Sequence, residues 1–176
     1  MDDVHKASIL ILDVDGVLNT AQMPGKHALH PKLLRRLKAL VVATSCRIVL
    51  STTWRLQECN VRVLLNALEE AGVSSDTVVG QTPSLGVEEL RRRCRGGNRD
   101  TLGETRRALE IIDFLDANPH LEAPGGAFAI VDDIDVLAVD DDAARSRLQG
   151  HFVRTEVESG LTERCCERLI ECLMRR

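Results

Sequence analysis

The sequence has few aromatic residues and none of the cysteine or histidine spacings that are typical of zinc sites. Phe, Trp and Tyr together make up 2% of the 176 residues, so the core must be built from Leu, Val, Ile and Ala. The six cysteines include no CxxC pair, and the five histidines include no HxxxH or HExxH pattern. We therefore expect no zinc site, and free thiols in a reducing intracellular compartment, either cytoplasmic or nuclear.

A large excess of positive charge and long apolar runs are also missing. The formal net charge is −4, which argues against broad electrostatic capture of nucleic acid. No segment has the charged start and apolar run of a signal peptide, and no apolar stretch approaches the length of a membrane span. We expect a soluble single domain over residues 1–176, with no membrane association and no evident obligate protein partner, and the chain is long enough to bury a full core.

Apolar runs of strand length alternate with segments of helical period, which is the pattern of an α/β fold. We predict a Rossmann-like three-layer sandwich with a mainly parallel sheet of about five strands and no large cap domain. Residues 80–100 have weak periodicity and are expected to form an insertion or mobile loop. Helices are expected to begin at Pro31, near 101 and near 162, and another to end at Gly72. The expected strands are 8–13, 47–52, 76–79, 127–133 and 151–155.

Polar side chains stand at the ends of three of these expected strands. They are Asp13 and Asp15, Ser51 and Thr52, and Asp132 and Asp133. In open α/β sheets the ligand lies beyond the carboxyl ends of the strands, so these side chains converge if their strands are neighbours. Carboxylates gathered in one crevice repel each other, and Mg²⁺ prefers carboxylate oxygens together with waters and phosphate oxygens. The pattern therefore favours a magnesium site.

Such a cluster supports phosphoryl transfer. A carboxylate beside Mg²⁺ can attack phosphorus and form an aspartyl-phosphate. A second aspartate, two residues further on, is close enough to protonate the leaving oxygen and later to take a proton from water. A hydroxyl at a neighbouring strand end can bind a phosphoryl oxygen, and a basic side chain is still needed to complete the site.

The motifs DVDGVLN (13–19), VLSTTWR (49–55) and IVDD (130–133) occur in this order and resemble those of the haloacid dehalogenase-like (HAD) superfamily of Mg²⁺-dependent phosphohydrolases. More narrowly, the chain is similar to the small HAD domains of Swiss Army Knife RNA-repair proteins. This likeness rests on TP at 82–83, Arg107 with EI at 110–111, and SGLT at 159–162, and it covers nearly the whole chain. It implies a HAD-like fold and a phosphatase whose substrate is a phosphorylated small molecule, a nucleotide or a nucleic-acid end.

The resemblance assigns roles to the acids. Asp13 corresponds to the nucleophile. Asp15 corresponds to the general acid/base and also contributes its backbone carbonyl to Mg²⁺. Asp132 and Asp133 match the metal-binding motif, and either of the two can be the direct ligand. The implied metal site thus consists of Asp13, Asp15, Asp132 and Asp133.

The hydroxyl and basic motifs each leave a choice. Thr52 fits the hydroxyl motif best and Ser51 second, and adjacent strand residues point to opposite faces, so only one faces the phosphate. The family's third motif is usually Lys, and here Arg107 is the best match, with Arg106 beside it. An Arg supplies the same positive charge through two parallel hydrogen bonds.

Further candidate substrate-binding residues are Gly16, Thr53 and Arg55. For Arg55, an ion pair with a carboxylate near the site is slightly favoured over contact with a substrate phosphate. Trp54, the only Trp, is expected to pack in the core or against a helix start. The segment RRRCRGGNR (91–99) is either a solvated face or a basic flap that holds a polyanionic substrate.

Two other functional classes are compatible with the pattern. A binding or scaffold module would keep the fold and the anion site without turnover, and the replacement of the usual Lys keeps this hypothesis open. A phosphate-accepting receiver domain shares the general fold and the acid cluster, but receivers lack the DxDG pair at the end of the first strand. Both aspartates and the acidic pair are present, so we favour the enzyme.

Overall fold

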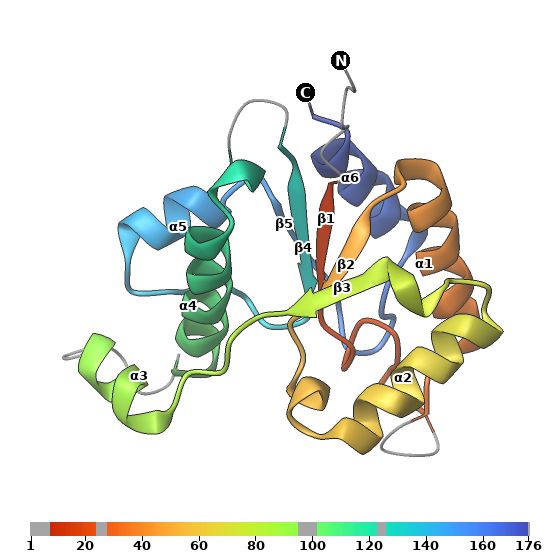
Figure 1. Cartoon of the computed structure of the whole chain (residues 1–176), viewed down its shortest axis with the longest axis horizontal. Coiled ribbons are helices and arrows are strands. Elements are labelled where there is room, and N and C mark those ends of the chain that lie inside the picture. Colours follow the sequence, from red (N-terminus) through yellow and green to blue (C-terminus); the bar gives the residue numbers. More distant parts are fainter. Residues whose placement is uncertain (1–7, 24–27, 95–101, 123–125, 176) are drawn as a thin grey trace.

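A single sheet of five parallel strands forms the centre of the protein. The computed structural model describes residues 8–23, 28–94, 102–122 and 126–175 (Figure 1). The strand order is β3-β2-β1-β4-β5, so β1 is central. The predicted α/β fold with about five parallel strands is confirmed. The strands are β1 (Ile9–Leu12), β2 (Arg47–Leu50), β3 (Val78–Gln81), β4 (Phe128–Asp132) and β5 (Phe152–Arg154).

Helices cover both faces of the sheet (Figure 1). One face packs against α1 (Pro31–Thr44), α2 (Glu58–Glu70) and α6 (Glu163–Leu173), and the other packs against α4 (Leu102–Ala117) and α5 (Asp142–Leu148). Because both faces are covered, all four residues of β1 are buried, and the strand is a continuous apolar run rather than an alternating one.

Local sequence signals set the helix ends. The first helix begins at Pro31, whose missing N–H is not needed in the first turn, and the His30 side chain accepts from the Lys32 N–H (3.2 Å). The last helix is capped by Thr162, whose Oγ1 accepts from the Cys165 N–H (3.2 Å). The predicted starts of both helices are confirmed.

Part of the region 80–100, which is expected to be an insertion or a mobile loop, has regular structure. The third strand is shifted to Val78–Gln81, because the short helix η2 (Ser75–Thr77) occupies the residues before it. A further helix, α3 (Val87–Arg93), follows and buries only Leu90. One buried side chain in seven residues leaves no periodic pattern that the sequence alone could reveal. Residues 95–101, which include part of the Arg-rich segment and the expected cap Thr101, lie outside the described residues.

All six cysteines are free thiols, as the sequence predicts. Cys46 and Cys172 are buried in the core cluster beneath α1 and α6. Among the residues that the structure describes, no helix is both long enough and apolar enough to cross a bilayer.

The register of the sheet brings three strand ends together. Leu12 at the end of β1 pairs with Leu50 of β2 on one side and with Val131 of β4 on the other. The next residues along the three strands, Asp13, Ser51 and Asp132, therefore lie side by side at the carboxyl edge of the sheet.

Candidate active site

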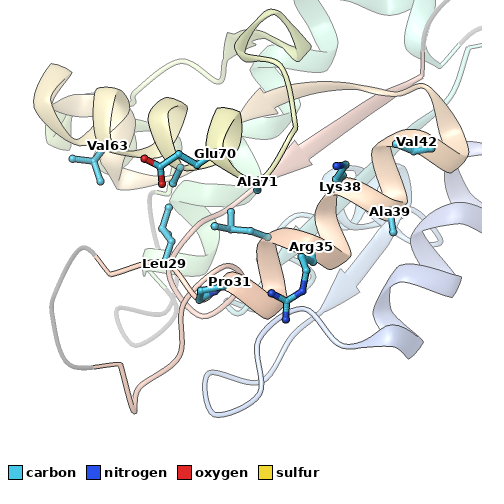
Figure 2. Close-up of a pocket in the computed structure, with 11 residues that line it drawn as sticks. Leu29, Pro31, Arg35, Lys38, Ala39, Val42, Val63, Glu70 and Ala71 are labelled. Atoms are coloured by element: carbon cyan, nitrogen blue, oxygen red, sulfur yellow. The ribbon is translucent and has the colours of Figure 1, made fainter.

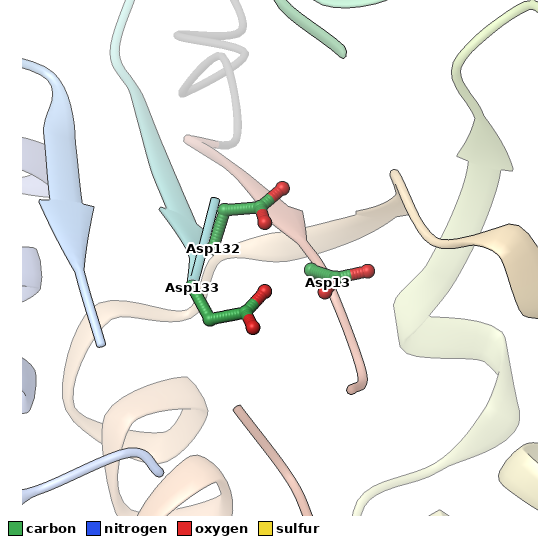
Figure 3. A group of neighbouring side chains, drawn as sticks. All are labelled: Asp13, Asp132 and Asp133. Carbon is green, nitrogen blue, oxygen red and sulfur yellow. The ribbon is translucent and has the colours of Figure 1, made fainter. Parts of the chain in front are cut away.

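Three carboxyl groups meet at this edge. Figure 3 shows Asp132 and Asp133, at the end of β4, beside Asp13, which follows β1. One carboxylate oxygen of each lies within 4.8 Å of the others. Asp13 and Asp132 are 3% and 0% exposed, and Asp133 is partly buried. An all-oxygen donor set of this size suits a hard divalent cation such as Mg²⁺. The expected convergence of the acids that follow the first and fourth strands is present.

Arg107 of α4 joins two of the three acids. Its Nη1 donates to Asp13 Oδ1 (3.1 Å) and to Asp132 Oδ2 (2.8 Å), and the side chain is buried. Arg107 therefore reaches the clustered acids, which supports its choice over the adjacent Arg106, and the replacement of the usual Lys by Arg107 stays a prediction. Three ionised carboxylates and one guanidinium leave two negative charges. One divalent cation would balance this negative charge.

Burial is the main influence on the pKa of each of these acids, and their mutual charges add to it. Burial raises the pKa of Asp13 well above its ordinary value, the Asp132 charge raises it further, and the Arg107 guanidinium lowers it. Burial likewise raises the pKa of Asp132 to about 6, against the opposing effects of Arg107 and the Ile134 N–H. The pKa of Asp133 is also raised by burial. The cluster therefore favours protons when no cation balances it, and a bound cation would reverse this preference.

Asp15 lies outside this cluster and is held by two neutral donors. Its exposed carboxyl group accepts from Asn19 Nδ2 at Oδ1 (2.8 Å) and from Trp54 Nε1 at Oδ2 (3.0 Å). Sequence reasoning missed both contacts. Asn19 reaches back to Asp15 across the turn that contains Gly16, whose φ is +69°, and no helical period in the sequence indicates this contact. For Trp54 the expected burial is found, but its bond to Asp15 was not foreseen.

Gly16 provides space for Asp133. Its φ is +69°, and a Cβ added there would lie 2.6 Å from the Asp133 Cγ. Its N–H donates to Asn19 Oδ1 (2.9 Å), and its carbonyl accepts from Thr155 Oγ1 (2.8 Å). The sequence predicts Gly16 as a substrate-binding residue, whereas the structure commits both of its polar backbone groups to protein partners.

The residues after β2 have separate surroundings. Thr52 is fully buried, and its Oγ1 accepts from the Trp54 N–H (3.3 Å). Ser51 is also buried, and its Oγ lies 3.5 Å from Thr82 Oγ1. Thr53 begins the short helix η1 (Thr53–Leu56) and is exposed. Thr52 as the phosphoryl ligand, with Ser51 as the second choice, and Thr53 as a substrate contact stay predictions.

Arg55 forms the ion pair that the sequence analysis slightly favours. Its Nη2 lies 2.6 Å from Glu110 Oε2, and the side chains are 3% and 4% exposed. Its other hydrogen bonds include those to the carbonyls of Thr82 (3.0 Å) and Pro83 (3.0 Å). Its guanidinium is buried among these protein partners, so the ion pair is the role that the structure supports for Arg55, and contact with a substrate phosphate stays a prediction. The TP and EI motifs belong to this same buried cluster.

The described part of the Arg-rich segment lies on α3. Arg92 pairs with Glu89 (2.7 Å) and Arg93 with Asp113 (2.8 Å). Two of its arginines are thus already in ion pairs, which weakens the hypothesis of a basic flap. Residues 95–99 of the segment lie outside the described residues.

Two hollows differ in their relation to the acids. One of about 310 Å³ lies beside Asp15 and Asp133 and is also lined by Asn19, Met23 and Val157. A larger one, of about 800 Å³, lies between α1 and α2 (Figure 2). Its lining is mostly apolar and includes none of the predicted site residues. The smaller hollow therefore adjoins the acid cluster through Asp133, whereas the larger one lies apart from the predicted site residues.

One comparison with known proteins gives a match over most of the chain. The family model described as HAD domain in Swiss Army Knife RNA repair proteins matches residues 9–166. This span runs from the start of β1 into α6 and includes the three clustered acids and Arg107. No curated protein and no solved structure matches the chain.

Proposed function

The chain belongs to the family of HAD domains in Swiss Army Knife RNA repair proteins, and we propose on that basis that it is a Mg²⁺-dependent phosphomonoesterase that reacts through an aspartyl-phosphate. At the level of the superfamily it is a HAD-like phosphohydrolase. The observation that carries the finer proposal is the position of Arg107, which bonds to Asp13 and Asp132 inside a cluster of three carboxylates.

Mg²⁺ fits the donor set. Asp13, Asp132 and Asp133 would hold it, together with the backbone carbonyl of Asp15. Once bound, it would neutralise the excess negative charge and polarise the phosphoryl oxygens. The raised pKa values of Asp13 and Asp132 mean that both acids favour the protonated form without a cation. The nucleophile must be ionised to react, and a bound cation would restore that form.

In the first half-reaction a carboxylate oxygen of Asp13 attacks phosphorus, and the bond from phosphorus to the leaving oxygen breaks. Asp15 donates a proton to that oxygen, so the leaving group departs as an alcohol. Arg107 stabilises the charge on the transferred phosphoryl group, and the hydroxyl of Thr52, or of Ser51, binds one of its oxygens.

In the second half-reaction Asp15, now ionised, takes a proton from water. The water oxygen attacks the phosphorus of the aspartyl-phosphate, and the bond to Asp13 breaks. Inorganic phosphate leaves, and both aspartates return to their starting states. Asp15 therefore acts first as an acid and then as a base.

The family and the access to the site support a proposal for the substrate class. The family's description names RNA repair, which favours a phosphate at a nucleic-acid end or on a nucleotide. The described residues between Asp13 and Thr52 form a turn, α1 and β2, which agrees with an open site. The hollow beside Asp15 offers space for the leaving group.

The test is a screen for phosphate release with Mg²⁺ from 5′- and 3′-phosphorylated oligonucleotides, nucleotides and small phosphomonoesters. Asp13→Asn should abolish turnover while the protein stays folded. The matched control is Asp76→Asn, which changes an exposed aspartate before β3 and should leave activity unchanged. Activity that survives in Asp13→Asn would refute the nucleophile, and a wild type without turnover of any ester would favour the binding module.

A further inference from the structure

The side chain of Asp15 is fixed from two sides, although it is exposed. Asn19 Nδ2 donates to one carboxylate oxygen (2.8 Å) and Trp54 Nε1 to the other (3.0 Å). The two donors come from different parts of the chain. Asn19 ends the turn that follows Asp15, whereas Trp54 lies in η1 after β2. An exposed aspartate without such contacts would move among its rotamers.

The donors are themselves held in place. Trp54 is 3% exposed and packs in the core cluster beneath α1 and α2. Asn19 is 9% exposed, and its Oδ1 accepts from the Gly16 N–H (2.9 Å), which fixes which end of the amide faces Asp15. The orientation of the Asp15 carboxyl group is therefore determined by buried groups.

Trp54 also contacts the strand end that is predicted to bind phosphate. Its indole N–H bonds to Asp15, and its backbone N–H donates to Thr52 Oγ1 (3.3 Å). One residue thus links the predicted acid/base to the predicted phosphoryl-binding hydroxyl. In a bound phosphoester, Thr52 would contact the phosphoryl group and Asp15 would contact the leaving oxygen. Trp54 would set the position of these two side chains relative to each other.

We propose that Trp54 and Asn19 are positioning residues that orient the Asp15 carboxyl group for proton transfer to the leaving oxygen. The inference rests on the proposed function. An ionised carboxylate offers about four acceptor positions, so two N–H donors leave room for the proton that is transferred. The same donors stabilise the negative charge on Asp15 after its proton has passed to the leaving oxygen and the bond to phosphorus has broken.

The first experiment observes the contact without requiring activity. Trp54 is the only Trp, so the ¹H–¹⁵N spectrum contains a single indole cross-peak that needs no further assignment. Asp15→Ala should move this peak upfield and speed its hydrogen exchange about tenfold, as expected for loss of a bond to a charged acceptor. Asp76→Ala is the matched control. A peak and an exchange rate that are unchanged in Asp15→Ala would overturn the inference.

The second experiment tests the role of the contact. Proton donation matters more for a poor leaving group, so Trp54→Phe should lower kcat/KM, which reports on the first half-reaction, about tenfold for an alkyl phosphate and much less for 4-nitrophenyl phosphate. Asn19→Ala should show the same selectivity, and it keeps the Trp in the core if Trp54→Phe folds poorly. In an Asp15→Ala background neither substitution should have a further effect.

The outcomes separate the two proposals. Equal losses on both esters, in an enzyme whose wild type is active, would overturn the positioning role and leave the proposed function intact. A wild type that hydrolyses neither these esters nor phosphorylated oligonucleotides would overturn the proposed function, and the positioning role with it.

Discussion

Arg107 Nη1 lies 3.1 Å from Asp13 Oδ1, and both side chains are almost completely buried. The two residues are far apart in the sequence and come from opposite sides of the site, since Asp13 follows the central strand and Arg107 belongs to a helix that covers one face of the sheet. Arg107 keeps Asp132 as a partner (2.8 Å) when the charge of Asp13 is removed, whereas removal of Arg107 leaves both buried carboxyl groups without their cationic partner.

Two substitutions of Arg107 should show whether catalysis depends on its positive charge or on the planar shape of its guanidinium group. Arg107→Met should lower kcat by about 10²–10³, because a buried donor to the transferred phosphoryl group is lost. Arg107→Lys should lose much less, since it keeps the charge but gives up the planar fork. The measurement is steady-state hydrolysis of the best ester found in the screen. Equal activity of the Met and Lys variants would contradict a role for the charge.

The buried pair of Arg55 and Glu110 should be important for stability. Glu110→Gln or Arg55→Met should lower the free energy of unfolding by about 3–5 kcal/mol, because each leaves one buried charge unpaired. The matched control is Arg62→Ala, which breaks an exposed pair with Glu58 and should cost less than about 1 kcal/mol. Urea unfolding followed by circular dichroism measures both. A small effect in the buried pair would show that water reaches it in solution.

Gly16→Ala should impair the site more than the fold. Its backbone has φ +69°, and the added Cβ would lie 2.6 Å from the Asp133 Cγ, so the Asp133 carboxyl group must shift. We expect weaker Mg²⁺ binding by calorimetry and a stability loss of about 1–3 kcal/mol from the strained backbone. The control Gly80→Ala has nothing within 4 Å of its added Cβ. Unchanged Mg²⁺ affinity in Gly16→Ala would exclude Asp133 as a ligand.

The parts of the site that the sequence predicts are those set by strand ends. A buried parallel strand reads as an apolar run, and its first polar residue marks the edge of the sheet, so Asp13 and Asp132 could be placed from local pattern. Their actual convergence depends on β1 and β4 being neighbours, which was an assumption and is found in the structure. Arg107 needed the family resemblance, because several arginines in that region share its local surroundings.

The parts that could not be predicted depend on packing between distant segments. Arg55 bonds to Glu110 and to the chain at Thr82 because η1, α4 and the segment after β3 meet there, and no local pattern encodes that meeting. The bond from Trp54 to Asp15 has the same origin. Arg and Trp side chains have several possible hydrogen-bond partners. The contacts of Arg55 and Trp54 therefore became known only from the structure.

The acid cluster should make stability depend on pH and on Mg²⁺. Folding raises the pKa of Asp13 well above its unfolded value of about 3.9. The folded state then holds a proton that the unfolded chain has lost, so this group's contribution to stability falls as pH rises from about 4 through the raised pKa. Asp13→Asn removes the titration. Without metal its melting temperature should differ least from that of the wild type below about pH 4 and should lie above it near pH 8, by about 2–4 °C per kcal/mol.

Addition of Mg²⁺ should reverse this order near pH 8. The ion would bind the ionised wild-type cluster and stabilise it, whereas Asp13→Asn lacks one ligand and should gain less. Thermal melts in EDTA and in MgCl₂, with NaCl at matched ionic strength as the control, measure both effects. A wild type that melts above Asp13→Asn at pH 8 in EDTA would mean that Arg107 already balances the cluster. In that case the negative charge would no longer support a divalent cation at this site.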